Sequence, residues 1–133
     1  MTEDRRQRSE GRRPIHSVQD LVVYKRSYDL AIALFVASKV FPKQETYALT
    51  DQLRRASRSI PANIREGFAK RKYPNLFIRH LYDAFGSCEE TRTWLDFAKD
   101  CDYLKDGQYE ELRRQFDELS AMLYGLIRNW RSL

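Results

Sequence analysis

The sequence of 133 residues is poor in the residue types that build disulfide frameworks, metal sites and phosphate loops: two cysteines, two histidines, five glycines and four prolines. A site made of several histidines is impossible with His16 and His80 alone, and two cysteines cannot form a framework of bridges. No glycine-rich phosphate loop, nucleophile elbow or HExxH helix is present. We therefore expect no catalytic site, no metal and no other cofactor, and free thiols at Cys88 and Cys101.

Long hydrophobic runs are also missing. The most apolar stretch, 21–40, contains four charged residues, which a spanning helix of roughly 20 apolar residues would not carry. The first 14 residues lack the apolar segment of a secretory signal. We expect a cytoplasmic protein that makes no contact with a membrane.

Apolar residues make up 42% of the chain, which is enough for one globular core. The 24 Lys and Arg residues exceed the 19 Asp and Glu residues, and the net charge of +5 favours an anionic partner. Segment 1–14 holds five arginines against three acids and no apolar residue after Met1, so we expect a disordered basic arm. We expect segment 15–133 to form one domain.

Apolar residues recur every three or four positions in four segments of this domain, which predicts four helices. They run from Ser17 to about Val40, from Thr50 to about Phe68, from Asn75 to about Asp100 and from Asp106 to about Trp130. The first residue of each is its expected N-cap, and Ser17 pairs with Asp20 in a capping-box pattern. No convincing strand-like alternation occurs. The predicted fold is all-α, an antiparallel up-down four-helix bundle, with a kink in the second helix at Pro61.

Each predicted helix has an apolar face that we expect to lie in the core. On the first helix this face consists of Leu21, Tyr24, Tyr28, Ala31, Ile32, Phe35 and Val36. On the second it consists of Leu53, Ser57, Ile60, Ile64 and Phe68. On the third it consists of Phe77, Leu81, Ala84, Cys88, Thr91, Leu95 and Ala98.

A specific motif surrounds Pro61. It reads Leu53-Arg54-Arg55-Ala56, then Ser59-Ile60-Pro61-Ala62-Asn63-Ile64, then Glu66-Gly67-Phe68. Shorter matches such as Asp20-Leu21, Phe41-Pro42, Phe77-Ile78-Arg79 and Tyr103-Leu104 flank it in the right order. Over about Val18 to Trp130 the chain resembles the four-helix-bundle proteins encoded within intervening sequences of bacterial 23S ribosomal RNA genes.

The resemblance implies a ring-like homo-oligomer, expected to be a pentamer. It also implies similarity to the accessory proteins of diversity-generating retroelements, which work beside a reverse transcriptase and nucleic acid. The chain departs from the family pattern at four positions. Arg58 and Arg65 replace residues that are more often apolar or small, Ala48 replaces a glycine, and Arg92 replaces an acid.

The motif and the turn after it carry seven basic residues against one acid, Glu66, a net charge of +6. These candidate nucleic-acid-binding residues are Arg54, Arg55, Arg58, Arg65, Lys70, Arg71 and Lys72. Three of them, Arg54, Arg58 and Arg65, lie within roughly 40° on a helix and can track RNA or DNA phosphates. The alternative is pairing with the acids of the third helix, or with those of another subunit. Tyr47 and Tyr73 could stack on bases near this patch, or could simply cover an end of the core.

The third helix has more apolar surface than one core face needs. The surplus residues, expected at a subunit interface, are Ile78, Tyr82, Phe85, Gly86 and Phe97. The alternative is a wide core face. A glycine on this side would let another helix approach closely.

Two functional hypotheses follow. In the first, an oligomeric basic bundle binds RNA or another nucleic acid without reading its sequence. In the second, the chain is a scaffold or accessory subunit whose basic rim engages an acidic protein partner. A polar cluster of Ser59, Asn63 and Glu66 resembles a site, but without a nucleophile or metal we expect it to be a structural network.

Overall fold

A computed structural model of the chain describes residues 15–130. Segment 1–14, the expected basic arm, lies outside the described residues, as does segment 131–133. Four long helices make up most of the fold: α2 (Val22–Ala37), α3 (Leu49–Ala69), α4 (Pro74–Asp100) and α5 (Asp106–Asn129). Three short 3-10 turns accompany them: η1 (Val18–Asp20), η2 (Ser38–Val40) and η3 (Lys43–Glu45). No strand occurs within residues 15–130, and the all-α prediction is confirmed.

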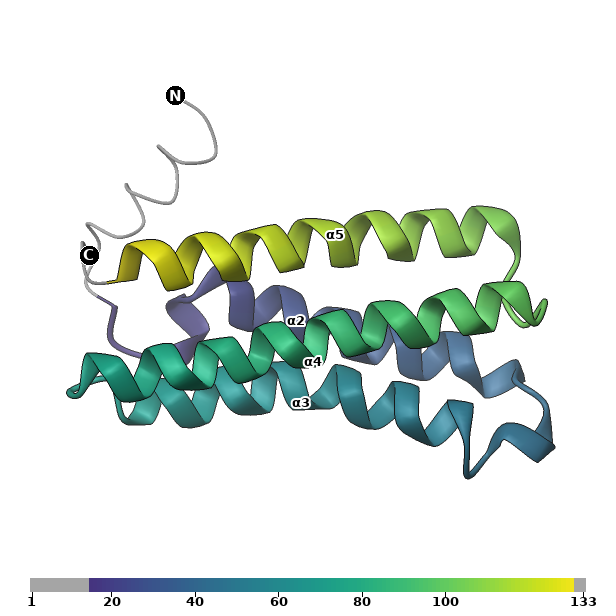
Figure 1. The fold of residues 1–133 in the computed structure, drawn as a ribbon, viewed down its shortest axis with the longest axis horizontal. Helices are drawn as coiled ribbons and strands as arrows, with labels where there is room; N and C mark the ends of the chain where they lie inside the picture. The colour runs from purple at the N-terminus through teal and green to yellow at the C-terminus, as the bar shows by residue number, and fades with distance from the viewer. Residues whose placement is uncertain (1–14, 131–133) are drawn as a thin grey trace.

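The four long helices lie side by side as a bundle (Figure 1). The α2–α3 and α4–α5 connections lie at one end of the bundle, and the α3–α4 connection lies at the other (Figure 1). Over residues 15–130, no helix is long and apolar enough to cross a membrane.

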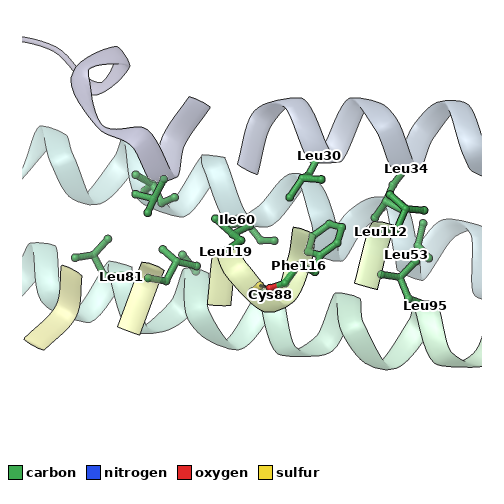
Figure 2. Close-up of a cluster of buried hydrophobic side chains, with 14 of the residues drawn as sticks. Leu30, Leu34, Leu53, Ile60, Leu81, Cys88, Leu95, Leu112, Phe116 and Leu119 are labelled. Carbon is green, nitrogen blue, oxygen red and sulfur yellow. Dashed lines mark hydrogen bonds between the residues drawn. The ribbon is translucent and has the colours of Figure 1, made fainter. Parts of the chain in front are cut away.

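The core runs along the bundle axis and takes side chains from all four helices (Figure 2). Every residue of the apolar faces predicted for α3 and α4 is buried. Phe116 of α5 lies in the middle of this core beside Cys88 of α4, whose Sγ lies 3.8 Å from the Phe116 carbonyl oxygen (Figure 2). Burial raises the pKa of the Cys88 thiol to about 12, so it stays protonated as a small core side chain.

The prediction for the first helix is wrong in two respects. It is not continuous from Ser17, because Leu21 is extended (φ −91°, ψ 121°) and separates η1 from α2. The Asp20 carboxylate accepts from the backbone N–H groups of Ser17 (3.1 Å) and His16 (2.9 Å), which lowers the pKa of Asp20. The predicted capping residues therefore cap the short 3-10 turn η1 and not the long helix α2.

The second error concerns the apolar face of α2. Three side chains expected in the core are half exposed: Tyr28 (50%), Ile32 (51%) and Val36 (58%). They recur at intervals of four residues, and Val40 continues the row at 79% exposure. The core takes the opposite side of α2, with Leu30 and Leu34 (Figure 2). An apolar stripe thus lies on the surface, and its four residues are called the α2 stripe below.

The start of α3 also differs from the prediction. The helix begins at Leu49, so Thr50 is its second residue and not its N-cap, and its side chain is buried. A carboxylate from the preceding turn replaces the expected cap: Glu45 Oε1 accepts from Leu49 N (3.3 Å). The other carboxylate oxygen of Glu45 accepts from the hydroxyl of Tyr103 (2.8 Å). This bond ties the α2–α3 connection to the α4–α5 connection.

The expected N-caps of the other two helices lie inside them: Asn75 is the second residue of α4, and Asp106 is the first residue of α5. α4 begins at Pro74, which suits the first position of a helix because its missing N–H needs no partner there. α5 begins at Asp106, with Lys105 as the flanking residue. α3 continues through Pro61, which is buried, and the kink expected there stays a prediction.

Candidate nucleic-acid interface

The arginines of α3 lie against α2. The guanidinium of Arg54 sits over the ring of Phe35, 4.7 Å from its centroid, and its Nε donates to Ser38 Oγ (2.8 Å). Arg58 lies over the same ring at 5.6 Å. Cation–π contacts of this kind contribute about 0.5–1 kcal/mol at exposed sites and leave the guanidinium charged. Arg54 is thus half-buried and anchored, while Arg58 stays exposed.

Arg65 continues the row on the same face of α3, about two helical turns beyond Arg58. Its Nη1 donates to the hydroxyl of Tyr24 on α2 (3.3 Å), and the side chain is exposed. None of Arg54, Arg58 and Arg65 forms an ion pair with a carboxylate among residues 15–130. Within the described chain, the alternative of pairing with α4 acids is not realised.

The acids of α4 are used elsewhere. Arg92 pairs with Glu89 (2.8 Å) and with Asp117 of α5 (2.7 Å), so the arginine that departs from the family pattern links α4 to α5. Asp96 accepts from the hydroxyl of Tyr109 (2.6 Å), and this bond raises the pKa of Tyr109 to about 12. Charge pairing is therefore concentrated on the α4–α5 side of the bundle.

Two of the predicted basic residues have local acidic partners. Arg55 pairs with Asp51 one turn earlier (3.2 Å), and Lys70 pairs with Glu66 (3.6 Å). Lys70 Nζ also lies 3.2 Å from Nε2 of His80 on α4. Exposed pairs of this type are weak, about 0.3–0.5 kcal/mol on a helix, so they leave the cations accessible.

The turn after α3 keeps its other two cations near aromatic rings. The guanidinium of Arg71 lies 3.9 Å from the centroid of Phe68 and donates to the Phe68 carbonyl (3.1 Å). Lys72 Nζ lies 5.9 Å from the ring of Tyr73, which is 59% exposed. Tyr47 is 93% exposed but precedes α3, so the length of that helix separates it from this turn. The structure thus places Tyr73, and not Tyr47, beside the basic residues of this turn.

The structure also contains a groove that the sequence interpretation missed. It lies between α2 and α3, has a volume of about 440 Å³ and is partly open to solvent. Its residues on α2 are Tyr24, Tyr28, Ala31, Ile32 and Phe35, and those on α3 are Arg58, Pro61, Ala62 and Arg65. We call it the α2–α3 groove. Two residues of the α2 stripe, Tyr28 and Ile32, belong to its α2 wall. The sequence interpretation placed both in the core, so it could not reveal the groove.

The predicted interface residues on α4 have two kinds of surroundings. Tyr82 (52%) and Phe97 (53%) are half exposed, and an added Cβ at Gly86 meets no atom within 4 Å. Ile78 and Phe85 are only partly buried and pack against the core. α4 therefore carries both a wide core face and exposed aromatic surface beyond it.

The polar cluster proposed from the sequence is divided. Ser59 Oγ and Ser87 Oγ lie 2.8 Å apart, and the Asn63 amide donates to the Ser59 carbonyl (2.9 Å). Glu66 takes no part in it and pairs with Lys70. The Ser59–Ser87 contact is a structural link between α3 and α4. In residues 15–130, no group of three or more His, Cys, Asp or Glu residues is arranged to hold a metal ion.

These features define an all-helical bundle in which Arg58 and Arg65 of α3 lie against α2 and have no carboxylate partner among residues 15–130. The family model for the 23S rRNA-intervening sequence protein matches residues 19–125, and the chain belongs to that family. A solved structure from Bacteroides thetaiotaomicron, a protein with unknown function from the S23 ribosomal protein family, is similar, with a TM-score of 0.72 and 27% identity. The similarity covers 80% of this chain and 96% of that one. No curated protein matches. The resemblance seen in the sequence is confirmed.

Proposed function

We propose that the chain is a non-catalytic, oligomeric bundle that binds RNA or another nucleic acid through the basic residues of α3 and the turn after it. This basic face consists of Arg54, Arg55, Arg58, Arg65, Lys70, Arg71 and Lys72. One observation carries the proposal: Arg58 and Arg65 are exposed, and neither pairs with a carboxylate of the described chain. Their charge is therefore available to an external anion.

Phosphates are the anions that such a row suits. A guanidinium can hold a phosphate through two parallel N–H donors, and the release of condensed counterions supplies much of the binding free energy. Neither term depends on base sequence, so binding is expected to follow charge and shape. Arg54 is held by Ser38 and Phe35, so we assign the larger share to Arg58 and Arg65.

The test is a salt series with a fluorescent structured RNA, measured by anisotropy for the wild type and for the double variant Arg58→Ser, Arg65→Ser. We expect wild-type affinity to fall steeply as salt rises. The variant is expected to bind roughly tenfold more weakly at moderate salt, and its slope of log K against log salt should fall by about 1 for each phosphate that it no longer neutralises.

The matched control is Arg113→Ser with Arg114→Ser on α5, which also removes two positive charges. Both control arginines already pair with acids of the same helix, so this variant is expected to keep the wild-type slope. Circular dichroism verifies that each variant is helical. Equal decreases in affinity for the two double variants would show that only net charge matters, and an absence of RNA binding at low salt would refute the proposal.

We further propose that α4 supplies contacts between copies in a ring, expected to be a pentamer from the family resemblance. The contact residues are Ile78, Tyr82, Phe85, Gly86 and Phe97. Two half-exposed aromatic rings and an open glycine support this assignment.

Light scattering tests the contact. Tyr82→Glu with Phe97→Glu would place two charges in an apolar interface, so the measured mass should fall to that of one chain. Gln44→Glu with Gln108→Glu adds the same charge at exposed positions and should leave the mass unchanged. A mass unaffected by the first pair would place the contact elsewhere.

The second candidate function is a scaffold or accessory subunit for an acidic protein partner. The α2 stripe favours it, because half-exposed Ile32 and Val36, with Ile32 beside Arg58 in the groove, suit a protein surface with both apolar and acidic groups. Copurification of one defined protein in place of salt-dependent RNA binding would support this candidate.

A further inference from the structure

The α2–α3 groove has the form of a notch between two arginines. Along α3, the small side chains of Pro61 and Ala62 lie between the long side chains of Arg58 and Arg65, which are seven residues and about 10 Å apart. The volume of about 440 Å³ falls within the roughly 300–1,000 Å³ usual for small-ligand pockets. A flat group of limited size can enter this notch.

The rim of the groove is cationic, and most of its N–H donors have no partner among residues 15–130. A guanidinium has five N–H donors, and Arg65 uses one of them in the described chain, at the hydroxyl of Tyr24. Arg58 is oriented by the Phe35 ring and donates no hydrogen bond within residues 15–130. An anion at this rim would therefore displace no ion pair of the described chain.

The α2 wall of the groove is aromatic and apolar. Tyr28 is half exposed, and its ring lies 6.3 Å from that of Tyr24 at an angle of 40°, so it is not covered by a parallel stack. Ile32 adds an apolar side chain to the same wall, also half exposed. Aromatic and apolar walls under a cationic rim are the elements with which proteins hold an unstacked base and its phosphates.

We propose that the α2–α3 groove binds an unstacked base of a single-stranded nucleic acid, with Tyr28 as the stacking residue and Arg58 and Arg65 on the flanking phosphates. This proposal rests on the nucleic-acid binding proposed above and adds a site and a ligand class to it. Bases in a duplex are paired and stacked, so only a single strand, loop or end can present one to the groove. The basic face alone predicts no such preference.

The experiment compares a short unstructured RNA, the DNA of the same sequence and the duplex made from that RNA and its complement. We expect the wild type to bind single strands more tightly than the duplex. Tyr28→Ala should weaken single-strand binding about tenfold, the scale of one base stack, and should leave duplex binding unchanged. Tyr28→Phe should restore the wild-type value, because the ring remains. The RNA and DNA arms show whether the 2′-hydroxyl contributes.

Tyr124→Ala is the matched control, since Tyr124 has a similar exposure (46%) but lies on α5, outside the groove. A single strand carrying 2-aminopurine gives a second readout: its emission should change on binding the wild type and not on binding Tyr28→Ala. If single strands and duplex bind equally and Tyr28→Ala weakens neither, the base site is refuted while phosphate binding stands. If no nucleic acid binds, both proposals fail. If Tyr28→Ala lowers the mass of the protein and not its affinity, a second copy occupies the groove and the base site is refuted.

Discussion

Replacing Phe116 by alanine is expected to lower the free energy of unfolding by about 3–5 kcal/mol. The ring is fully buried on α5, among side chains that α2, α3 and α4 also contribute (Figure 2). Because its neighbours are anchored in separate helices, they cannot all move into the space it leaves, and a cavity adds to the forfeited transfer free energy. Denaturant unfolding followed by circular dichroism measures the change, read from the midpoint at an unchanged slope.

Tyr47→Ala serves as the control for this measurement. It also removes a large aromatic side chain, but that side chain is 93% exposed, so the change should stay within about 0.5 kcal/mol. Comparable decreases in stability for the two variants would mean that the Phe116 side chain is not buried in the core. A large decrease for Phe116→Ala alone would place the centre of the core where the structure has it.

The sequence predicts α3 and α4 well for a physical reason. The face predicted for α3, from Leu53 to Phe68, is a single apolar line with polar residues beside it, and it is buried. On α4 all seven residues of the predicted stripe, from Phe77 to Ala98, are buried, because they recur every three or four positions along the whole helix. The neighbouring row that starts at Ile78, Tyr82 and Phe85 is interrupted by Glu89 and Arg92, so only the first row can supply a continuous core face.

The prediction for α2 fails because this helix is apolar over more than one face. Leu30 and Leu34 form one apolar row, which is buried. Tyr28, Ile32 and Val36 form a second apolar row on the opposite side of the helix, which is half exposed. Hydrophobicity cannot choose between two such rows, and only packing against α3 and α5 determines which one is buried. Two residues of the exposed row, Tyr28 and Ile32, line the α2–α3 groove.

The sequence predicts only part of the candidate site, because the rest depends on how the helices pack against one another. Charge counting along the chain locates the arginines of α3, since they are close in sequence. Their partners Phe35, Ser38 and Tyr24 come from α2 and could not be assigned from spacing. Opposite charge made the α4 acids the alternative partners of these arginines, but Glu89 bonds along α4 and to α5, and Asp96 bonds to α5.

The chain has a net charge of +5, and the packing of the helices determines which basic residues have acidic partners. On α5, Arg113 and Arg114 pair with acids of their own helix, and Arg26 of α2 reaches Glu118 (2.8 Å). These three arginines are neutralised nearby, while Arg58 and Arg65 contact aromatic side chains of α2 that leave their charge intact. The position of the charge, and not its total, is what makes the α2–α3 side suited to an anion.

Replacing Gly67 by alanine is expected to destabilise the bundle by about 2 kcal/mol. α3 and α4 approach so closely here that an added Cβ would lie 2.4 Å from Cβ of His80 and 3.0 Å from Phe77 Cδ1. The His80 Cβ is attached to the backbone and cannot rotate away, so the helices must separate, at a cost of up to about 3 kcal/mol for an overpacked core. The better helix propensity of alanine returns about 1 kcal/mol of this. Thermal or denaturant unfolding monitored at 222 nm measures the difference.

Gly125→Ala on α5 is the matched comparison, because the same change at an open position inside a helix carries the propensity gain without the clash. No atom lies within 4 Å of its added Cβ, so this variant is expected to be more stable than the wild type by up to about 1 kcal/mol. The two substitutions should therefore shift stability in opposite directions. If Gly67→Ala were also stabilising, α3 and α4 could not approach each other as closely at His80 as the structure shows. That contact positions Lys70 beside His80, so the same variant should disturb the basic turn that starts there.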